Sequence, residues 1–244
     1  MTIVDDTHDA FGRALVDHLE DRDGPELVLE CDDGSSWTAD MQPRDFFAPP
    51  EAWPSWERDA LANAAGSVLD LGAGGGRHSL YLQARGHAVT AVDASPGAAA
   101  AMSTRGVVDV RIADLRDVPM DGAWKTILLM GGNLGIAGDW APTRSLLERL
   151  ANGTSPGAIL IGDSVDPTSD APNDLDYQAR NRMAGFHRGH IRLRLRYRDS
   201  VTPWWDQLNV PLEDLEALID RTGWVLEDRL GDADGYAVVL RHIE

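Results

Sequence analysis

The chain has very little cysteine and no long uninterrupted apolar sequence. Cys31 is the only cysteine in 244 residues, which excludes an intrachain disulfide and any zinc site built from several cysteines. No apolar run approaches the roughly 20 residues that span a membrane. The first residues, MTIVDDTHDAFGR, lack the apolar core of a secretion signal. These absences predict a cytoplasmic protein that does not enter a membrane.

Positive charge is scarce as well. The 22 lysine and arginine residues, of which only Lys125 is a lysine, face 40 aspartate and glutamate residues, and the net charge is −18. A field of this sign repels nucleic acid and anionic lipid, so neither is expected as a partner. Acidity of this kind more often serves solubility than the binding of a basic partner. The sequence specifies no oligomeric state.

Short apolar strands alternate with helical segments in the central part of the chain. The expected strands cover residues 68–71, 88–92, 107–113, 126–130 and 158–162. Ser95-Pro96 begins one of the helices in the favoured order of an N-cap followed by proline, and another helix is expected at 142–152. Alternation of this kind predicts a parallel sheet with helices on both faces.

The C-terminal part has a different pattern. A helix is expected at 211–222, followed by strands at 224–229 and 236–241. Their connection is too short for a crossover helix, so these two strands should be antiparallel. The expected fold is α/β, with a Rossmann-like, doubly wound, seven-stranded and mostly parallel sheet that ends in an antiparallel hairpin.

Two further regions flank this core. The N-terminal one contains an expected helix at 7–21, a hairpin of 26–31 and 37–39, an aromatic, proline-rich segment at 46–56, and a helix ending near Ala65. We predict that residues 1–65 form a helical and hairpin lid. Residues 66–244 form the core, and an insertion at 164–210 caps the substrate. Within the insertion, stretches 190–198 and 204–210 alternate as a β-hairpin does.

Four arginines lie on one face of the first insertion strand, at 192, 194, 196 and 198. Such a row can bind an anionic substrate. More often it is a solvated strand edge that discourages pairing with other chains and is matched by acidic residues. The second interpretation is favoured here because the chain has a surplus of acids.

A glycine-rich loop, Asp70-Leu71-Gly72-Ala73-Gly74-Gly75-Gly76, joins the first central strand to a helix. Glycines there let a ligand approach the backbone, and the helix start offers free N–H groups. A phosphate-binding P-loop is excluded because Gly76-Arg77-His78 stands where Gly-Lys-Ser/Thr is needed. A dinucleotide fingerprint beginning at Gly72 would place its third glycine at Arg77, which disfavours a nicotinamide oxidoreductase. The shifted register Gly74-x-Gly76-x-x-Ser79 is tolerable but leaves Asp70 and Gly72 unexplained. The pattern Asp-x-Gly-x-Gly-x-Gly matches at every position.

With these glycines and the acids at the ends of the next two strands, the chain resembles the class I S-adenosylmethionine (SAM)-dependent methyltransferases of small molecules. The resemblance covers residues 67–162 and, more weakly, 211 to the end. It implies that the glycine loop packs against the methionine part of SAM. It further implies that Asp93 accepts both ribose hydroxyls, that Asp114 accepts the adenine amino group, and that the Leu115 backbone reaches the adenine ring.

The implied cofactor site consists of Asp70, Gly72, Ala73, Gly74, Gly76, His78, Asp93, Ala94, Asp114, Leu115, Met130 and Gly131. The product derived from the cofactor would be S-adenosylhomocysteine (SAH). Methyl transfer of this kind is an in-line displacement that requires positioning but no metal.

Substrate should bind beyond the carboxyl ends of the strands, under the two flanking regions. The candidates for contacting it are Phe47, Trp53, Trp56, Asn133 and Trp204. Aromatic walls are usual for small-molecule pockets, although each tryptophan taken alone could equally anchor its segment on the core. A base is needed when the acceptor must lose a proton. The candidate catalytic residues are His78, Asn133, His187 and His190, although a lone histidine is more often structural.

The sequence therefore predicts a SAM-dependent enzyme that methylates a small molecule. The Asn/Asp-Pro-Pro-aromatic motif of base and amide methylases is missing after the strand at 126–130, which counts against nucleobase or glutamine acceptors. The alternative is a protein of the same fold that binds SAM or SAH without methyl transfer, as a sensor or as the scaffold of another reaction.

Overall fold

The computed structural model describes residues 7–22, 24–120, 124–167, 172–233 and 235–243. The chain forms two compact units, each described here by itself. Unit 1 consists of Met1–Pro54, Ser67–Pro119 and Leu193–Trp205, and unit 2 consists of Ser55–Gly66, Met120–Arg192 and Asp206–Glu244. None of the helices in the described ranges has the length and apolar character needed to cross a bilayer.

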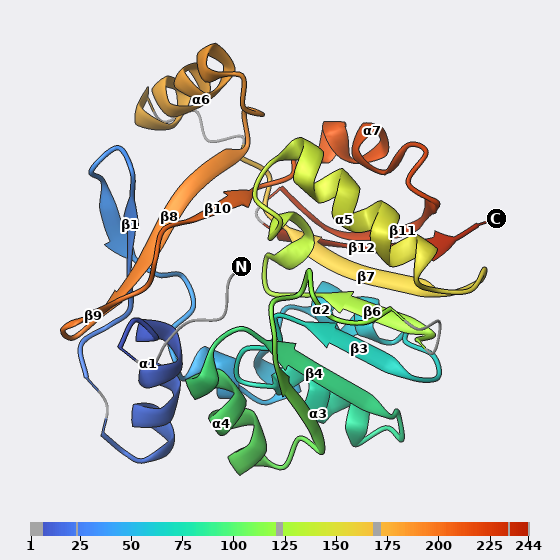
Figure 1. The fold of residues 1–244 in the computed structure, drawn as a ribbon, viewed down its shortest axis with the longest axis horizontal. Helices are drawn as coiled ribbons and strands as arrows, with labels where there is room; N and C mark the ends of the chain where they lie inside the picture. The colour runs from blue at the N-terminus through green and yellow to red at the C-terminus, as the bar shows by residue number, and fades with distance from the viewer. Residues whose placement is uncertain (1–6, 23, 121–123, 168–171, 234, 244) are drawn as a thin grey trace. The chain divides into compact units, whose positions relative to one another are not determined.

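The main sheet has seven strands in the order β11-β12-β7-β6-β3-β4-β5 (Figure 1). Their bounds are β3 Val68–Leu71, β4 Val89–Asp93, β5 Asp109–Ile112, β6 Thr126–Leu129, β7 Ile159–Ser164, β11 Trp224–Asp232 and β12 Gly235–His242. β3 and β4, β4 and β5, and β6 and β7 pair in parallel, whereas β12 runs antiparallel to both β7 and β11. The predicted Rossmann-like α/β fold with an antiparallel C-terminal hairpin is confirmed.

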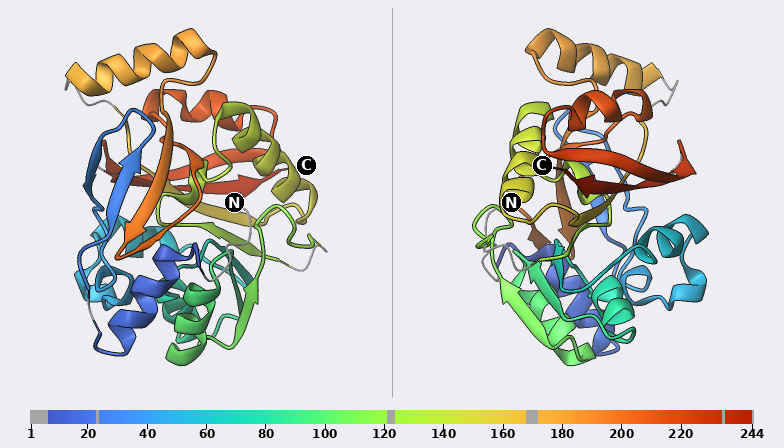
Figure 2. Two further views of the ribbon diagram at one scale, coloured as in Figure 1. Left: turned by 60° about the vertical axis from the view of Figure 1, so that its left-hand side comes forward. Right: turned by 90° about the vertical axis from the view of Figure 1, so that its right-hand side faces the viewer.

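The described part of unit 1 contains three α-helices: α1 Ala10–Leu19, α3 Arg77–Gln83 and α4 Pro96–Arg105. Each long helix begins at a side-chain cap. Asp9 Oδ1 accepts the Gly12 N–H of α1 at 2.9 Å, and Ser95 Oγ accepts the Ala98 N–H of α4 at 2.9 Å. α4 packs on β4 and β5, and α1 packs in turn on α4 (Figure 2). The unit therefore has an additional helical layer formed by the N-terminal region.

A second, smaller sheet joins segments that are far apart in the sequence. Its strands follow the order β10-β8-β1-β2, with β9 also paired to β8. The bounds are β1 Val28–Cys31, β2 Ser36–Thr38, β8 His190–Tyr197, β9 Ser200–Val201 and β10 Trp205–Leu208. β1 and β8 lie side by side and antiparallel, with Leu29 opposite Leu195 (Figure 1). The N-terminal hairpin and the insertion, predicted as separate additions, thus form one sheet.

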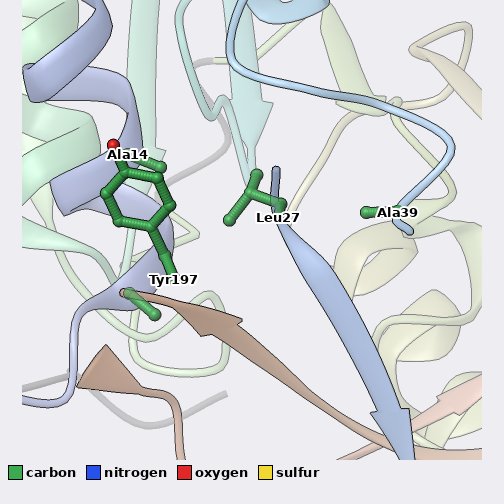
Figure 3. Packing of buried hydrophobic residues seen from close by; sticks show 5 residues of the cluster. Ala14, Leu27, Ala39 and Tyr197 are labelled. Atoms are coloured by element: carbon green, nitrogen blue, oxygen red, sulfur yellow. The ribbon is translucent and has the colours of Figure 1, made fainter. Parts of the chain in front are cut away.

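A compact apolar cluster connects this sheet to α1 (Figure 3). It contains Ala10, Ala14, Leu27, Ala39 and Tyr197. Tyr197 is 2% exposed, and its hydroxyl donates to Asp17 Oδ2 at 3.2 Å. Burial of an aromatic side chain with a satisfied polar end stabilises a fold by about 2 to 3 kcal/mol. The cluster therefore anchors α1 to β8.

The arginine face of β8 pairs with acids. Arg194 Nε and Arg196 Nε both donate to the Glu30 carboxylate, at 2.6 and 2.5 Å. Arg198 Nε lies 3.1 Å from Asp17. The interpretation that acids match this row is confirmed for these three arginines. The interpretation of β8 as an edge strand is wrong, because β8 has β1 on one side and β10 on the other.

Replacing Glu30 with alanine is expected to lower the free energy of unfolding by about 1 to 2 kcal/mol, because it removes charge-assisted hydrogen bonds to two partly exposed arginines. The guanidinium of Arg196 contributes most to holding the pKa of Glu30 below its usual value. The stabilisation is therefore present at neutral pH and is lost as the pH falls through that pKa. Urea denaturation at neutral and at acid pH measures both effects.

Glu227→Ala is the matched control for this prediction. Glu227 also pairs with an arginine, Arg241, but its side chain is 42% exposed against 19% for Glu30. An exposed pair contributes less than about 1 kcal/mol. Equal effects of the two substitutions would show that the Glu30 pairs do not stabilise the smaller sheet.

Helix bounds in unit 2 differ from the expectations. α2, Ser55–Leu61, ends before the predicted Ala65. Ala65 lies outside the helix, where its N–H donates to the Thr126 hydroxyl and its carbonyl accepts from that hydroxyl, at 2.9 Å each. The helix predicted at 211–222 consists of a 3-10 turn, η4 Leu212–Asp214, and a short α7, Leu215–Ile219. Arg144 donates to the carbonyls of 217, 218 and 220 there. These deviations arise from long-range contacts.

The remaining helices of unit 2 are α5, Trp140–Asn152, and α6, Pro172–Ala184. α5 begins slightly before its predicted start. α6 was not predicted, because its sequence is polar and lacks the apolar stripe that signals a helix.

Candidate functional site

The glycine loop lies between β3 and α3, at the carboxyl end of β3. Gly72, Gly74 and Gly76 have φ values of 78°, 54° and 76°, a left-handed conformation that favours glycine. The N–H groups of Gly72 and Ala73 donate to Val92 O at 2.8 and 3.0 Å. The loop is therefore held against the end of β4, where Asp93 follows.

Asp93, the last residue of β4, is 6% exposed and receives two backbone hydrogen bonds. Its Oδ2 accepts the Gly74 N–H at 2.8 Å, and its Oδ1 accepts the Ser95 N–H at 2.9 Å. Burial raises the pKa of Asp93 to about 6, although the two N–H groups oppose this shift. A carboxylate offers about four acceptor positions, so each oxygen can still accept one hydroxyl group.

Asp70 lies on β3 below the loop and is 1% exposed. Its Oδ2 accepts the Ser79 hydroxyl of α3 at 2.6 Å. Its Oδ1 has no hydrogen-bond partner among the residues that the structure describes. Burial raises the pKa of Asp70, while His78 and the Ser79 hydrogen bond act in the opposite direction. Asp70 thus ties the first turn of α3 to the sheet.

Asp114 follows β5, whose Ile112 pairs with Asp93. Its carboxylate accepts two hydrogen bonds from the Arg116 guanidinium, at 2.9 and 2.6 Å, and one from the Arg116 backbone N–H at 2.8 Å. Burial alone would raise the pKa of Asp114, but the bonds from Arg116 outweigh it and lower the pKa to about 2. The group is therefore a firmly ionised acceptor. The next residue, Leu115, is buried.

Aromatic rings from α1 and from the segment after β2 cover the glycine loop within unit 1. Phe11 of α1 and Phe46 of η1, Asp45–Phe47, meet edge to face with centroids 5.0 Å apart. Both rings come within 3.5 Å of the position a Cβ would take at Gly74. At Gly75 a Cβ would lie 2.8 Å from Phe46 O, so this close approach requires glycine.

Arg105 at the end of α4 holds this cover in place. Its guanidinium donates to the carbonyls of Phe46 and Gly75 and lies 4.6 Å above the Phe47 ring, which stacks on His18 with centroids 5.4 Å apart. Phe47, predicted to contact substrate, is thus packed between two side chains. Sequence reasoning did not identify Arg105, because a single arginine near the end of a helix carries no distinguishing signal.

Trp53 and His78 contact each other. Their rings meet edge to face with centroids 5.2 Å apart, and the Trp53 indole N–H donates to Ala48 O at 2.9 Å. Arg77 lies 5.2 Å from the Trp53 ring. These contacts pack the aromatic segment against α3. The substrate role of Trp53 and the catalytic role of His78 remain predictions.

The other predicted site residues near β6 belong to unit 2. Met130 and Gly131 follow the strand, and Asn133 opens η3, Asn133–Gly135. The Asn133 side-chain amide donates to Met130 O at 2.8 Å, and the Gly132 N–H donates to Asp163 Oδ1 at 2.7 Å. The loop is therefore fixed by its own hydrogen bonds.

Each candidate histidine of unit 2 contacts an aspartate and an aromatic ring. His187 Nε2 lies 3.3 Å from Asp214 and the ring stacks on Trp140, and burial lowers the pKa of His187. His190 Nε2 lies 3.0 Å from Asp206 and the ring stacks on Phe186. His190 Nδ1 is buried and has no hydrogen-bond partner in the described part of the chain.

Two predicted substrate residues have packing partners of their own. Trp56, on α2, lies 3.2 Å from the position that a Cβ would take at Gly231, in the β11–β12 hairpin. Trp204 is 36% exposed and lies under the Arg194 guanidinium at 4.5 Å.

Unit 1 brings together most of the predicted cofactor residues. They are Asp70, Gly72, Ala73, Gly74, Gly76, His78, Asp93, Ala94, Asp114 and Leu115. Met130, Gly131, Asn133, His187, His190 and Trp56 belong to unit 2. The sequence did not identify Asp9 and Arg116, which bond to Ser95 and Asp114. Asp9 has the local signature of an N-cap, but nothing local indicates its second partner.

Comparison with known proteins agrees with this arrangement. A methyltransferase domain model matches residues 68–157. A SAM-dependent methyltransferase from Bacteroides fragilis, solved in complex with SAH, is 26% identical with a TM-score of 0.83, and the match covers 100% of this chain and 98% of that one. No curated protein sequence matched the chain.

Two more distant structures share the fold. The CcbJ methyltransferase from Streptomyces caelestis is 14% identical with a TM-score of 0.62, over 97% of this chain and 99% of its own. A SAM-dependent methyltransferase from Methanosarcina mazei is 13% identical with a TM-score of 0.61, over 78% and 98%. The domain model and the Bacteroides fragilis structure, together with the glycine loop and the acids at the ends of β4 and β5, identify the chain as a SAM-dependent methyltransferase with the Rossmann-like fold of the class I enzymes.

Proposed function

We propose that this enzyme transfers the methyl group of SAM to a small-molecule acceptor in the cytoplasm, and that unit 1 holds the cofactor. The observation that carries the proposal is Asp93, a buried carboxylate whose two oxygens are oriented by the Gly74 and Ser95 N–H groups. A vicinal diol is the complementary ligand, because each hydroxyl can donate to one oxygen.

The residues present fit an adenosine cofactor. Asp93 would accept the ribose hydroxyls, and Asp114 with the Leu115 backbone would meet the adenine edge. The left-handed conformation of Gly72, Gly74 and Gly76 shapes the loop whose backbone would meet the methionine part. SAM, when bound, supplies a methyl group activated by its sulfonium. The chain's own contribution is to orient it and, through the aromatic cover of Phe11 and Phe46, to exclude water.

The small-molecule acceptor is supported by electrostatics and by the loop after β6. A net charge of −18 opposes the approach of nucleic acid. Gly131-Gly132-Asn133 stands where nucleobase and amide methylases have Asn/Asp-Pro-Pro-aromatic. We propose that Asn133 orients the acceptor, and that His187 or His190 receives a proton where the acceptor must lose one.

Calorimetric titration tests the cofactor assignment. We expect SAM and SAH to bind the purified protein with micromolar affinity, and NADH to give no heat and no fluorescence change. Absence of binding by both SAM and SAH would contradict the assignment.

An assay of SAH release tests the transfer itself and separates it from cofactor sensing. The acceptors are a panel of small amines, phenols and carboxylic acids, with duplex DNA and RNA in parallel. We expect SAH release with a member of the small-molecule panel. Release with the nucleic acids alone would overturn the acceptor class, and SAH binding without release for any acceptor would favour the sensor.

A further inference from the structure

The backbones of α1 and α4 touch where the two helices begin. A Cβ built on Gly97 would lie 2.6 Å from the Gly12 Cα, and a Cβ on Gly12 would lie 2.6 Å from the Gly97 Cα. Beyond this point Leu15 of α1 packs on Ala98 and Ala101 of α4. The first turn of α1 is thus placed directly on the segment that follows Asp93.

Asp9 occupies this junction and is 4% exposed. Its carboxylate accepts the Gly12 N–H of its own helix at 2.9 Å. It also accepts the Ser95 hydroxyl at 2.8 Å and the Gly97 N–H at 2.8 Å. One side chain therefore caps α1 and at the same time binds the first turn of α4.

Ser95 links Asp9 to Asp93. Its hydroxyl donates to Asp9, while its backbone N–H donates to Asp93 Oδ1 at 2.9 Å. The same hydroxyl oxygen accepts the Ala98 N–H, and Ser95 is 1% exposed. Ser95 therefore connects the two carboxylates, through its hydroxyl on one side and its backbone N–H on the other.

We propose that Asp9 is a positioning residue of the cofactor site, which holds Asp93 through Ser95 and thereby couples the docking of α1 to cofactor binding. This inference rests on the proposed cofactor role of Asp93. Reciprocity requires that a ligand on Asp93 stabilise the docked state of α1. The N-terminal helix then supports the binding site, although it lies outside the glycine loop and the strand ends.

The charges around Asp93 provide a second readout, which reports whether the Asp9 carboxylate acts on Asp93 and which a loss of stability alone would not change. The charged groups that act on Asp93 are Asp9 and Asp70, and Asp70 in turn faces His78 and Arg77 of α3. Burial is the main cause of the raised pKa of Asp93, and the negative charge of Asp9 adds to it. Neutralising Asp9 should therefore lower the pKa of Asp93.

The test is calorimetric titration of SAH into the wild type and Asp9→Asn from about pH 5 to pH 8. We expect Asp9→Asn to weaken SAH binding by about tenfold at the upper pH, the lower end of the loss that follows removal of a partner orienting a metal ligand. We also expect the pH midpoint of its affinity to lie below that of the wild type. Hydrogen exchange should show that SAH slows the amides of α1 in the wild type and not in Asp9→Asn.

Asp17→Asn is the matched control, because Asp17 is a buried acid of the same helix that binds Arg22, Arg198 and Tyr197 instead of Ser95. Its SAH affinity should fall much less than that of Asp9→Asn, even where its stability falls as far. The proposal would be overturned if Asp9→Asn bound SAH as tightly as the wild type, or if its pH midpoint did not move. It would also be overturned if Asp9→Asn and Asp17→Asn lost SAH affinity equally. Failure of the wild type to bind SAH would instead overturn the cofactor assignment.

Discussion

Replacing Asp93 with alanine is expected to weaken SAH binding by about a hundredfold or more at neutral pH. Two hydrogen bonds from ribose hydroxyls to a carboxylate would be lost, each contributing about 1.5 to 3 kcal/mol. The variant also loses the acceptors for the Gly74 and Ser95 N–H groups, so the glycine loop is less well held. Calorimetric titration with SAH measures the difference.

The same variant should change how stability depends on pH. Burial raises the pKa of Asp93 in the folded protein to about 6, from a usual value of 3.8. A carboxyl whose folded pKa is raised contributes stability that is present at low pH and is lost as the pH rises through the folded pKa. The unliganded wild type should therefore lose stability from about pH 4 to pH 6, and Asp93→Ala should lack this loss.

Asp109→Ala provides the control on the neighbouring strand. Asp109 lies on β5, bonds Thr90 and Arg111, and is not among the predicted cofactor residues. Its loss should leave SAH affinity within about threefold of the wild type, as expected of a substitution away from the ligand. If Asp93→Ala binds SAH as tightly as Asp109→Ala does, Asp93 does not hold the ribose.

Replacing Gly97 with alanine is expected to lower the free energy of unfolding by about 3 kcal/mol, at the upper end of the cost of overpacking. Helix propensity alone would predict the opposite change in the free energy of unfolding, since alanine in a helix interior is favoured over glycine by about 1 kcal/mol. Here the new Cβ would lie 2.5 Å from the Gly12 carbonyl carbon, which is backbone and cannot rotate away. The two helices would have to separate.

Urea denaturation of Gly97→Ala and of Ala100→Gly tests this contact. Ala100 is an exposed residue of the same helix, so its replacement measures propensity alone, with an expected loss of about 1 kcal/mol. Trypsin should cleave Gly97→Ala faster at Arg13 and Arg22 as its stability falls, because α1 separates from α4. A Gly97→Ala protein as stable as the wild type would mean that α1 does not lie against α4 as described.

Local sequence was sufficient for the main sheet and for most of the cofactor residues. Short apolar strands alternating with helices specify parallel pairing, and this places Asp70, Asp93 and Asp114 on three neighbouring strands or directly after them. The glycine loop was recognisable because its left-handed residues must be glycine. These features depend on neighbours within a few residues, and periodicity and spacing report such neighbours well.

Tertiary structure decided everything that depends on residues distant in the sequence. The pairing of β1 with β8, the hydrogen bond from the Ser95 hydroxyl to Asp9 and the packing of Phe47 beside Arg105 join separate segments of unit 1. Hydrogen bonds and packing between such segments leave no periodic pattern in either one, because each segment can meet many alternative partners of the same chemistry. The sequence by itself therefore determined the strand ends where a cofactor would bind. Only the folded chain determined which side chains hold those ends in position.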